Sequence, residues 1–178
     1  MSRAFSCVLC LLTLLFLVAC TNGIHSKTGG SPVSPSPTPA QISSSDQVVK
    51  VSSSPASIPQ SGSGDAVVTL SISPGFHVNA NPATFSYLIA TEVKPSKAEG
   101  LTVGSPNYPA GVKKKFQFAE QPLAVYEGDV PIKLNLRAEK NAAAGQRSLP
   151  IIVKVQACDE QQCFPPATLH STISVTLK

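Results

Sequence analysis

The segment LPIIVKVQACDEQQCFPP, residues 149–166, contains both the pattern that decides the fold and the residues that decide the chemistry. Its first half places an apolar residue at every second position, from Leu149 to Val155. This period of two is typical of a β-strand with one buried face. Its second half holds two cysteines, Cys158 and Cys163, and then two prolines that interrupt the next strand.

The same alternation recurs at residues 68–72, 132–136 and 173–177, and shorter candidate strands lie at 48–51, 85–93 and 115–118. Turn-forming pairs of Gly, Pro and Asn separate these segments, and no helical period of 3.6 residues is present. The pattern predicts an all-β protein, an immunoglobulin-like antiparallel β-sandwich of seven to nine strands.

The N-terminus has the pattern of an export signal. Arg3 precedes an apolar run at residues 4–19 that ends in LVAC. The run is too short for a typical membrane span but suits a secretory signal. LVAC resembles a bacterial lipobox, so we expect a lipoprotein signal peptide at 1–19, lipid on Cys20 and a periplasm-facing lipid anchor in the cell envelope. Thr21 stands where Asp favours inner-membrane retention in some bacteria, which favours the outer membrane.

Residues 20–45 are expected to form the lipidated Cys and a disordered tether, because 17 of the 25 residues after Cys20 are Ser, Thr, Pro or Gly. The folded domain is expected at 46–178. The formal charge of +4 is too small to indicate a nucleic-acid partner. The basic run at 113–115 is either a solvated strand end or a docking patch for an acidic partner.

Cys158 and Cys163 are the only thiols left if Cys7 and Cys10 leave with the signal and Cys20 is lipidated. Three interpretations remain open from the residues: a redox couple, a structural disulfide and a metal site with His77 or His170. A bond that closes so short a loop removes only about 2 kcal/mol of unfolded-state entropy. No second Cys pair completes a zinc set, so we expect no metal and no cofactor.

Local sequence suggests different roles for the two sulfurs. Alternation along the strand predicts that Cys158 faces away from the core, on an open face or sheet end. Asp159 and Glu160 beside Cys158 disfavour its thiolate. We therefore expect Cys163 to be the exchanging sulfur.

Six segments in order resemble the family of N-terminal periplasmic domains of the thiol:disulfide interchange protein DsbD. The segments are GFHVNANPA (75–83), YLIATEVK (87–94), GLTVGSPNYP (100–109), KKKFQF (113–118), LAVYEGDVPIKL (123–134) and QACDEQQCFPP (156–166). The resemblance covers nearly all of residues 46–178.

The resemblance implies an immunoglobulin-like domain whose Cys158/Cys163 pair cycles between dithiol and disulfide, with mixed disulfides at Cys163. In the family, electrons arrive from a membrane-embedded domain through a thioredoxin-like domain and pass to periplasmic disulfide proteins. A loop with an aromatic residue covers the cysteines. The matching loop here differs at residues 119–122, and its shielding candidates are Phe118, Glu120 and Tyr126. Their alternative roles are core aromatics and a solvated Glu.

The chain shows no transmembrane bundle and no Cys-x-x-Cys motif after the domain. We therefore expect a protein-disulfide reductase or interchange component whose partner acts in trans, either a thioredoxin-like protein or a DsbD-type membrane reductase. The competing hypothesis is a non-catalytic immunoglobulin-like binding or assembly lipoprotein, in which the disulfide is structural.

Overall fold

The computed structural model describes residues 41–178. The predicted signal peptide at 1–19, the lipidated Cys20 and most of the tether at 20–45 lie outside this range. Within it the chain forms a short 3-10 helix, η1 (Ser45–Gln47), and twelve strands. These are β1 (Val49–Ser53), β2 (Ala56–Ile58), β3 (Ser63–Ile72), β4 (His77–Asn79), β5 (Glu92–Pro95), β6 (Leu101–Val103), β7 (Val112–Lys114), β8 (Leu123–Tyr126), β9 (Asp129–Ala138), β10 (Gly145–Val155), β11 (Ala157–Cys158) and β12 (Ala167–Leu177).

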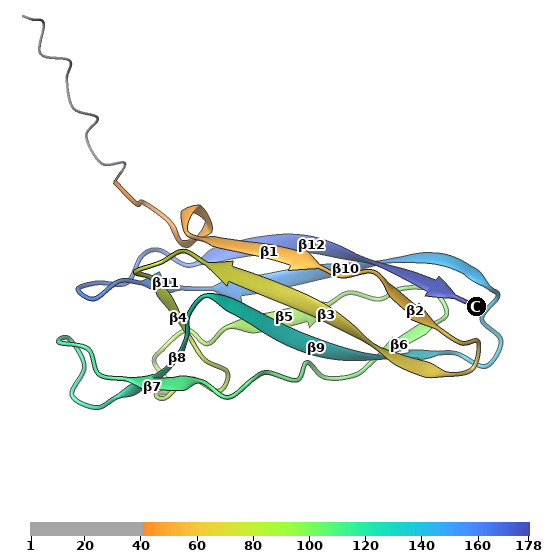
Figure 1. The fold of residues 1–178 in the computed structure, drawn as a ribbon, viewed down its shortest axis with the longest axis horizontal. Helices are drawn as coiled ribbons and strands as arrows, with labels where there is room; N and C mark the ends of the chain where they lie inside the picture. Colours follow the sequence, from red (N-terminus) through yellow and green to blue (C-terminus); the bar gives the residue numbers. More distant parts are fainter. Residues whose placement is uncertain (1–40) are drawn as a thin grey trace, which may run out of the picture. The chain divides into compact units, whose positions relative to one another are not determined.

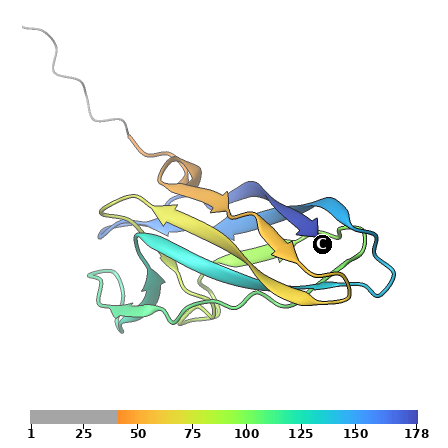
Figure 2. The same cartoon turned by 45° about the vertical axis from the view of Figure 1, so that its right-hand side comes forward.

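Two four-stranded sheets form the layers of a sandwich (Figures 1 and 2). One has the order β1-β3-β9-β6 and the other the order β2-β12-β10-β5. A third, smaller sheet has the order β11-β4-β8-β7 and lies at the end where β10 runs into β11. Strand pairs in these sheets are antiparallel except β2 with β12, which run parallel.

The core between the two large sheets is built by the predicted alternation. In β10, residues 149, 151, 153 and 155 are buried, and their neighbours at 150, 152 and 154 are exposed. The apolar sets in β3, β9 and β12 are buried in the same way, and their neighbours are exposed or half-buried. Since side chains alternate between the faces of a strand, each long strand contributes one continuous apolar row to the core. The all-β sandwich prediction is confirmed.

The small elements differ from the prediction. Seven to nine strands were expected and twelve are found in the described range, because several are only two to four residues long. Residues 85–91 form a loop instead of a strand, since Asn79 and Asn81 donate side-chain hydrogen bonds to the carbonyls of Ile89 and Thr91. Residues 115–118 form a turn, in which the Ala119 amide donates to the Phe116 carbonyl.

Ser45 joins the start of the domain to the segment that carries the cysteines. It is buried, and its hydroxyl donates to the Pro165 carbonyl at 2.7 Å and accepts from the Ala157 amide at 2.9 Å. The Ser45 amide donates to the same Pro165 carbonyl. Ser45, one residue before the predicted boundary at Asp46, thus makes contacts with the domain. No helix in residues 41–178 has the length and apolar character needed to cross a membrane.

Candidate redox site

The third sheet positions the two cysteines. β10 ends at Val155, and β11 consists of Ala157 and Cys158. Gln156 lies between the two strands and belongs to neither. β11 pairs antiparallel with β4, so that Cys158 lies opposite His77 and Ala157 opposite Val78. The backbone thus fixes Cys158 between the end of a long core strand and the small sheet.

Cys158 and Cys163 are joined by a disulfide, and their Cα atoms are 3.9 Å apart. Their surroundings differ. Cys158 has 1% of its surface exposed, whereas Cys163 is exposed at the surface. An approaching thiolate must reach a sulfur along the S–S axis, so access determines which sulfur is attacked. Of the two bonded residues, Cys163 is the one that is exposed to solvent.

The predicted open position of Cys158 is wrong. Ala157 belongs to the large core, and Cys158, the next residue, is on the opposite face and belongs to neither hydrophobic cluster found in the described chain. Alternation predicts an open face at this position. That face is not open, however, because β4 lies beside β11 and the buried His77 occupies the position across from Cys158.

The four residues between the cysteines form a compact turn. The Asp159 carboxylate accepts hydrogen bonds from the amides of Gln161 and Gln162, each at 2.8 Å, and the Asp159 amide donates to the Gln162 carbonyl. A carboxylate that bonds backbone amides two and three residues ahead stabilises a tight turn. Asp159 therefore holds the loop that presents Cys163.

Lys114, at the end of β7, connects three parts of the site. Its Nζ lies 2.7 Å from an oxygen of Glu127 and 3.0 Å from an oxygen of Glu160 in the cysteine loop. Hydrogen bonds to these two carboxylates raise the pKa of Lys114. The same Nζ is 5.5 Å from the centre of the Phe116 ring. Lys114 thus links the cysteine loop to the neighbouring turn.

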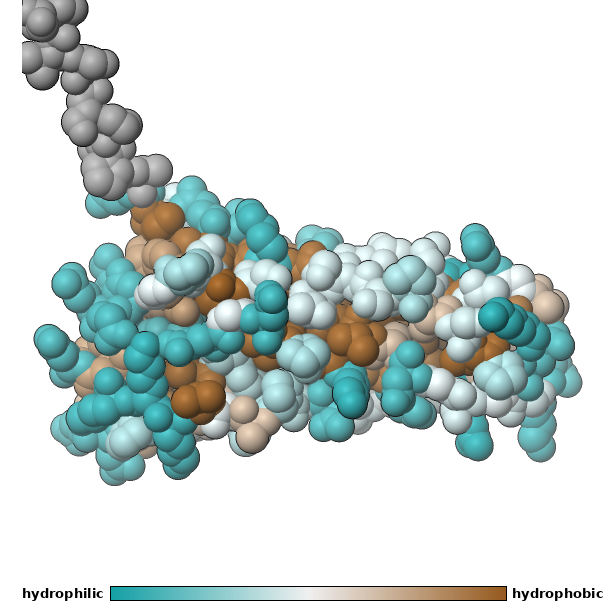
Figure 3. Space-filling model, viewed as in Figure 1, coloured by the Kyte–Doolittle hydropathy of each residue, from teal (hydrophilic) through white to brown (hydrophobic). Residues whose placement is uncertain are grey.

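Three aromatic rings stack beside this ion pair. His77 and Phe116 have ring centres 4.1 Å apart, and Phe116 and Phe118 have ring centres 5.3 Å apart. Phe116 is buried with Leu123 and Val125 in a second hydrophobic cluster. The stack runs from the residue opposite Cys158 to the surface, where Phe118 is 45% exposed. Hydrophilic residues gather on this end of the domain around a few apolar ones (Figure 3).

His77 is a buried ionisable group in this stack. Burial lowers its pKa below the ordinary value of 6.5, and the positive charge of Lys114 lowers it further. The negative charges of Glu127, Glu160 and Asp159 act in the opposite direction. The net effect favours the neutral imidazole in the folded protein.

The lowered pKa of His77 predicts a loss of stability in acid. Between pH 6.5 and the folded-state pKa, the unfolded chain binds more protons than the folded chain. The contribution of neutral His77 to the free energy of unfolding is therefore fully present above pH 6.5. This contribution is lost as the pH falls through the folded-state pKa of His77. Urea unfolding on both sides of pH 6.5 should show this decline in the wild type and a weaker one in His77→Phe. The exposed His170 provides the control, and an equal decline in His77→Phe and His170→Phe would contradict the prediction.

Comparison with protein families gives a decisive match. The family described as "Thiol:disulfide interchange protein DsbD, N-terminal" matches residues 40–174. The chain belongs to this family. The match covers the whole sandwich up to β12 and includes both cysteines. No curated protein matches the chain.

Solved structures of this family are among the remote structural matches. The N-terminal domain of DsbD from Neisseria meningitidis in its reduced form is 21% identical, with a TM-score of 0.41, over 61% of this chain and 75% of that one. The same domain in complex with the PilB N-terminal domain is 18% identical, with a TM-score of 0.40, over 61% and 73%. The N-terminal periplasmic domain of ScsB from Proteus mirabilis is 12% identical, with a TM-score of 0.41, over 71% and 44%.

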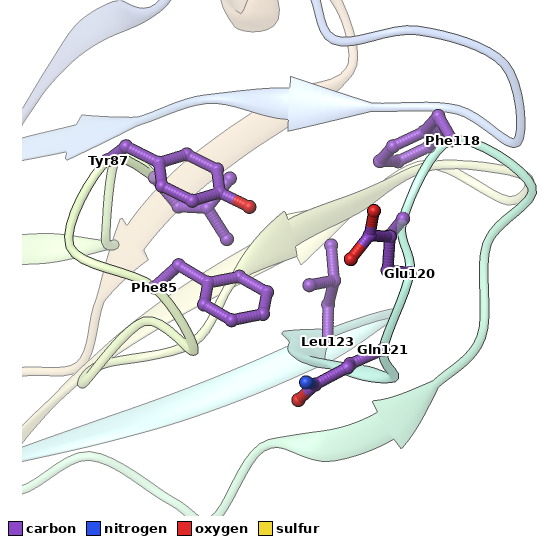
Figure 4. Close-up of a pocket in the computed structure, with 8 residues that line it drawn as sticks. Phe85, Tyr87, Phe118, Glu120, Gln121 and Leu123 are labelled. Carbon is purple, nitrogen blue, oxygen red and sulfur yellow. The ribbon is translucent and has the colours of Figure 1, made fainter.

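The three shielding candidates of this DsbD-family domain lie in different surroundings. Phe118 and Glu120 line a cavity of about 400 Å³ together with Phe85, Tyr87 and Leu123 (Figure 4). In the figure, Phe85 and Tyr87 come from one loop and Phe118 and Glu120 from the other, and they face each other across the cavity. The shielding role of Phe118 and Glu120 stays a prediction.

Tyr126 lies in the large core, where its hydroxyl donates to the Pro109 carbonyl at 2.9 Å and accepts from the Asn81 amide at 3.1 Å. These contacts correspond to the alternative role considered for Tyr126, a core aromatic. Two lysines of the basic run at 113–115 have different partners. Lys114 forms ion pairs with carboxylates, and Lys115 donates to the carbonyls of Ala119 and Glu120.

The sequence does not indicate the contacts that Phe116 and Lys114 make near the cysteines, and it presents His77 only as a candidate metal ligand. No local pattern marks them, because their role depends on pairing between strands distant in sequence. His170 lies on β12 opposite Ile152 of β10. Cys158 belongs to a different sheet, in which it pairs with His77 of β4. Among residues 41–178, no group of three or more His, Cys, Asp or Glu side chains is arranged to hold a metal ion.

Proposed function

We propose that this domain carries out thiol-disulfide exchange, passing reducing equivalents through the Cys158/Cys163 pair to periplasmic disulfide proteins. Membership of the DsbD N-terminal family supports the reaction class. The observation that carries the proposal is the asymmetry of the bonded pair, in which Cys163 is exposed and Cys158 is buried. A purely structural disulfide has no need of one accessible sulfur.

Reduction of the pair begins with attack by a donor thiolate on the sulfur of Cys163. The Cys158–Cys163 bond breaks, Cys158 leaves with the electron pair, and the donor becomes bonded to Cys163. A second donor thiol then attacks the donor sulfur in this mixed disulfide and releases Cys163 as a thiolate. The donor is oxidised to a disulfide, and the pair gains two electrons and two protons.

Reduction of a substrate runs through the same sulfur. The Cys163 thiolate attacks a substrate disulfide and releases one substrate thiolate. Cys158 then attacks Cys163, which reforms the Cys158–Cys163 bond and releases the second substrate sulfur. Because Cys158 is buried beside Cys163, the intramolecular attack on Cys163 is favoured over reaction of Cys158 with solvent species.

The partner and location are part of the proposal. The donor is a thioredoxin-like protein or a DsbD-type membrane reductase acting in trans, and the acceptors are periplasmic disulfide proteins. The domain is held at the membrane by a lipid on Cys20, facing the periplasm, with the outer membrane favoured. The family match supports the redox role, and the LVAC motif supports the anchor.

Equilibration in redox buffers tests the proposal against a structural disulfide. The oxidised chain is incubated with defined ratios of dithiol to disulfide, and its free thiols are alkylated and counted by mass. An exchange protein is expected to be reduced near the potential of thioredoxin, about −270 mV. Resistance to reduction down to about −300 mV or below would instead support the alternative, a binding or assembly module with a structural bond.

A further inference from the structure

His77 and Cys158 lie directly opposite each other in the antiparallel pairing of β4 with β11. Side chains at opposite positions of such a pair share one face of the sheet, with Cβ atoms about 4.5–5.5 Å apart. Each of the two residues has 1% of its surface exposed. The imidazole and the buried sulfur therefore lie on the same face of the small sheet, at directly opposed positions.

The Nε2 atom of His77 has no hydrogen-bond partner among residues 41–178, although it is fully buried. A buried polar atom without a partner costs free energy, and native proteins contain few of them. Phe116 stacks on one face of the imidazole ring, and the unpaired Nε2 lies on the edge of that ring. A buried imidazole with an open nitrogen beside a cysteine is suited to proton exchange with that cysteine.

Cys158 needs such a group. To attack Cys163 in a mixed disulfide, the Cys158 thiol must lose its proton, since the thiolate is the nucleophile. Burial disfavours the thiolate, and water has little access to Cys158. The adjacent Asp159 and Glu160 disfavour it further through their negative charges.

We propose that His77 accepts the proton of Cys158 when Cys158 resolves the mixed disulfide on Cys163, an inference that rests on the exchange function proposed above. The S–H bond of Cys158 breaks and its proton passes to the imidazole. The sulfur of Cys158 bonds to that of Cys163, and the partner sulfur leaves with the electron pair of its bond to Cys163. The imidazolium then releases the proton to the departing thiolate or to solvent. The partner is reduced, and the cysteine pair is oxidised.

The charges around His77 are compatible with this role. A proton acceptor has to start in its neutral form, which burial and the positive charge of Lys114 both favour. The negative charges of Glu127, Glu160 and Asp159 on the neighbouring elements act in favour of the imidazolium that forms after transfer. The site thus combines a neutral resting imidazole with nearby negative charge for its protonated form.

The test uses the full reduced chain and an aromatic disulfide reagent that releases a coloured thiolate at each step. The first release reports attack by Cys163, and the second reports resolution by Cys158. We expect His77→Phe, which keeps an aromatic ring to stack on Phe116, to slow the second release at neutral pH by at least about tenfold. The first release should be unchanged, and raising the pH should restore the second. His170→Phe is the control and should behave as the wild type.

A second variant and the wild-type pH profile keep the inference testable if His77→Phe does not fold. His77→Gln keeps a polar side chain without a titrating group and should also slow resolution. In the wild type, the rate of resolution should follow an ionisation below pH 6.5. An unchanged second release in the folded variants, or a wild-type rate that follows a free thiol near pH 8.5, would overturn the role of His77. A wild type without any first release would instead overturn the exchange function.

Discussion

Cys158→Ser is expected to accumulate a stable mixed disulfide with its partner at Cys163, whereas Cys163→Ser is expected to form none and to lose exchange down to background. The reason is access: Cys163 is exposed, and Cys158 has 1% of its surface exposed. In Cys158→Ser no second thiol remains to release the trapped partner. Non-reducing electrophoresis and intact mass of the trapped species measure the outcome.

The two cysteine variants serve as controls for each other. Both lose the same disulfide, and both should lose the same stability, about 2 kcal/mol for a loop this short. A difference in trapping therefore reports which sulfur is accessible and not how well the protein is folded. Stronger trapping through Cys158 in the Cys163→Ser variant would refute the assignment of the exchanging sulfur.

Phe116→Ala is expected to lower the free energy of unfolding by about 3–5 kcal/mol, the usual cost of truncating a buried Phe. Phe116 has 1% of its surface exposed and packs with Leu123 and Val125 in the second hydrophobic cluster, and it also supports the ring of His77. Its removal leaves a cavity beside the redox site. Urea unfolding of the oxidised protein measures the loss.

Phe118→Ala is the matched control for Phe116→Ala. It removes the next ring of the same stack, but Phe118 is 45% exposed, so the expected loss is about 1 kcal/mol. Equal losses in the two variants would show that the stack is a surface feature and does not form part of a core.

The large sheets were predictable because their strands are long enough to show a period. Leu149, Ile151, Val153 and Val155 occupy alternate positions of an eleven-residue strand, and all four are buried.

The redox site was predictable only in part, because its small sheet has strands of two to four residues. A strand of this length shows no measurable period. His77, Phe116 and Cys158 are distant in sequence, and they come together through the pairing of β4 with β11 and through ring stacking. The burial of Cys158 therefore depends on tertiary contacts that no local pattern contains.

Ser45 has a consequence for the reduced state of the protein. It bonds Ala157 on one side of the cysteines and Pro165 on the other, and the Phe164 amide also donates to the Ala157 carbonyl. The two ends of the cysteine loop are thus fastened by contacts that do not involve sulfur. Because these contacts do not involve sulfur, we expect them to persist when the disulfide is reduced and to keep the two thiols at a high effective concentration toward each other. The proposed exchange would then require little structural reorganisation of the cysteine loop.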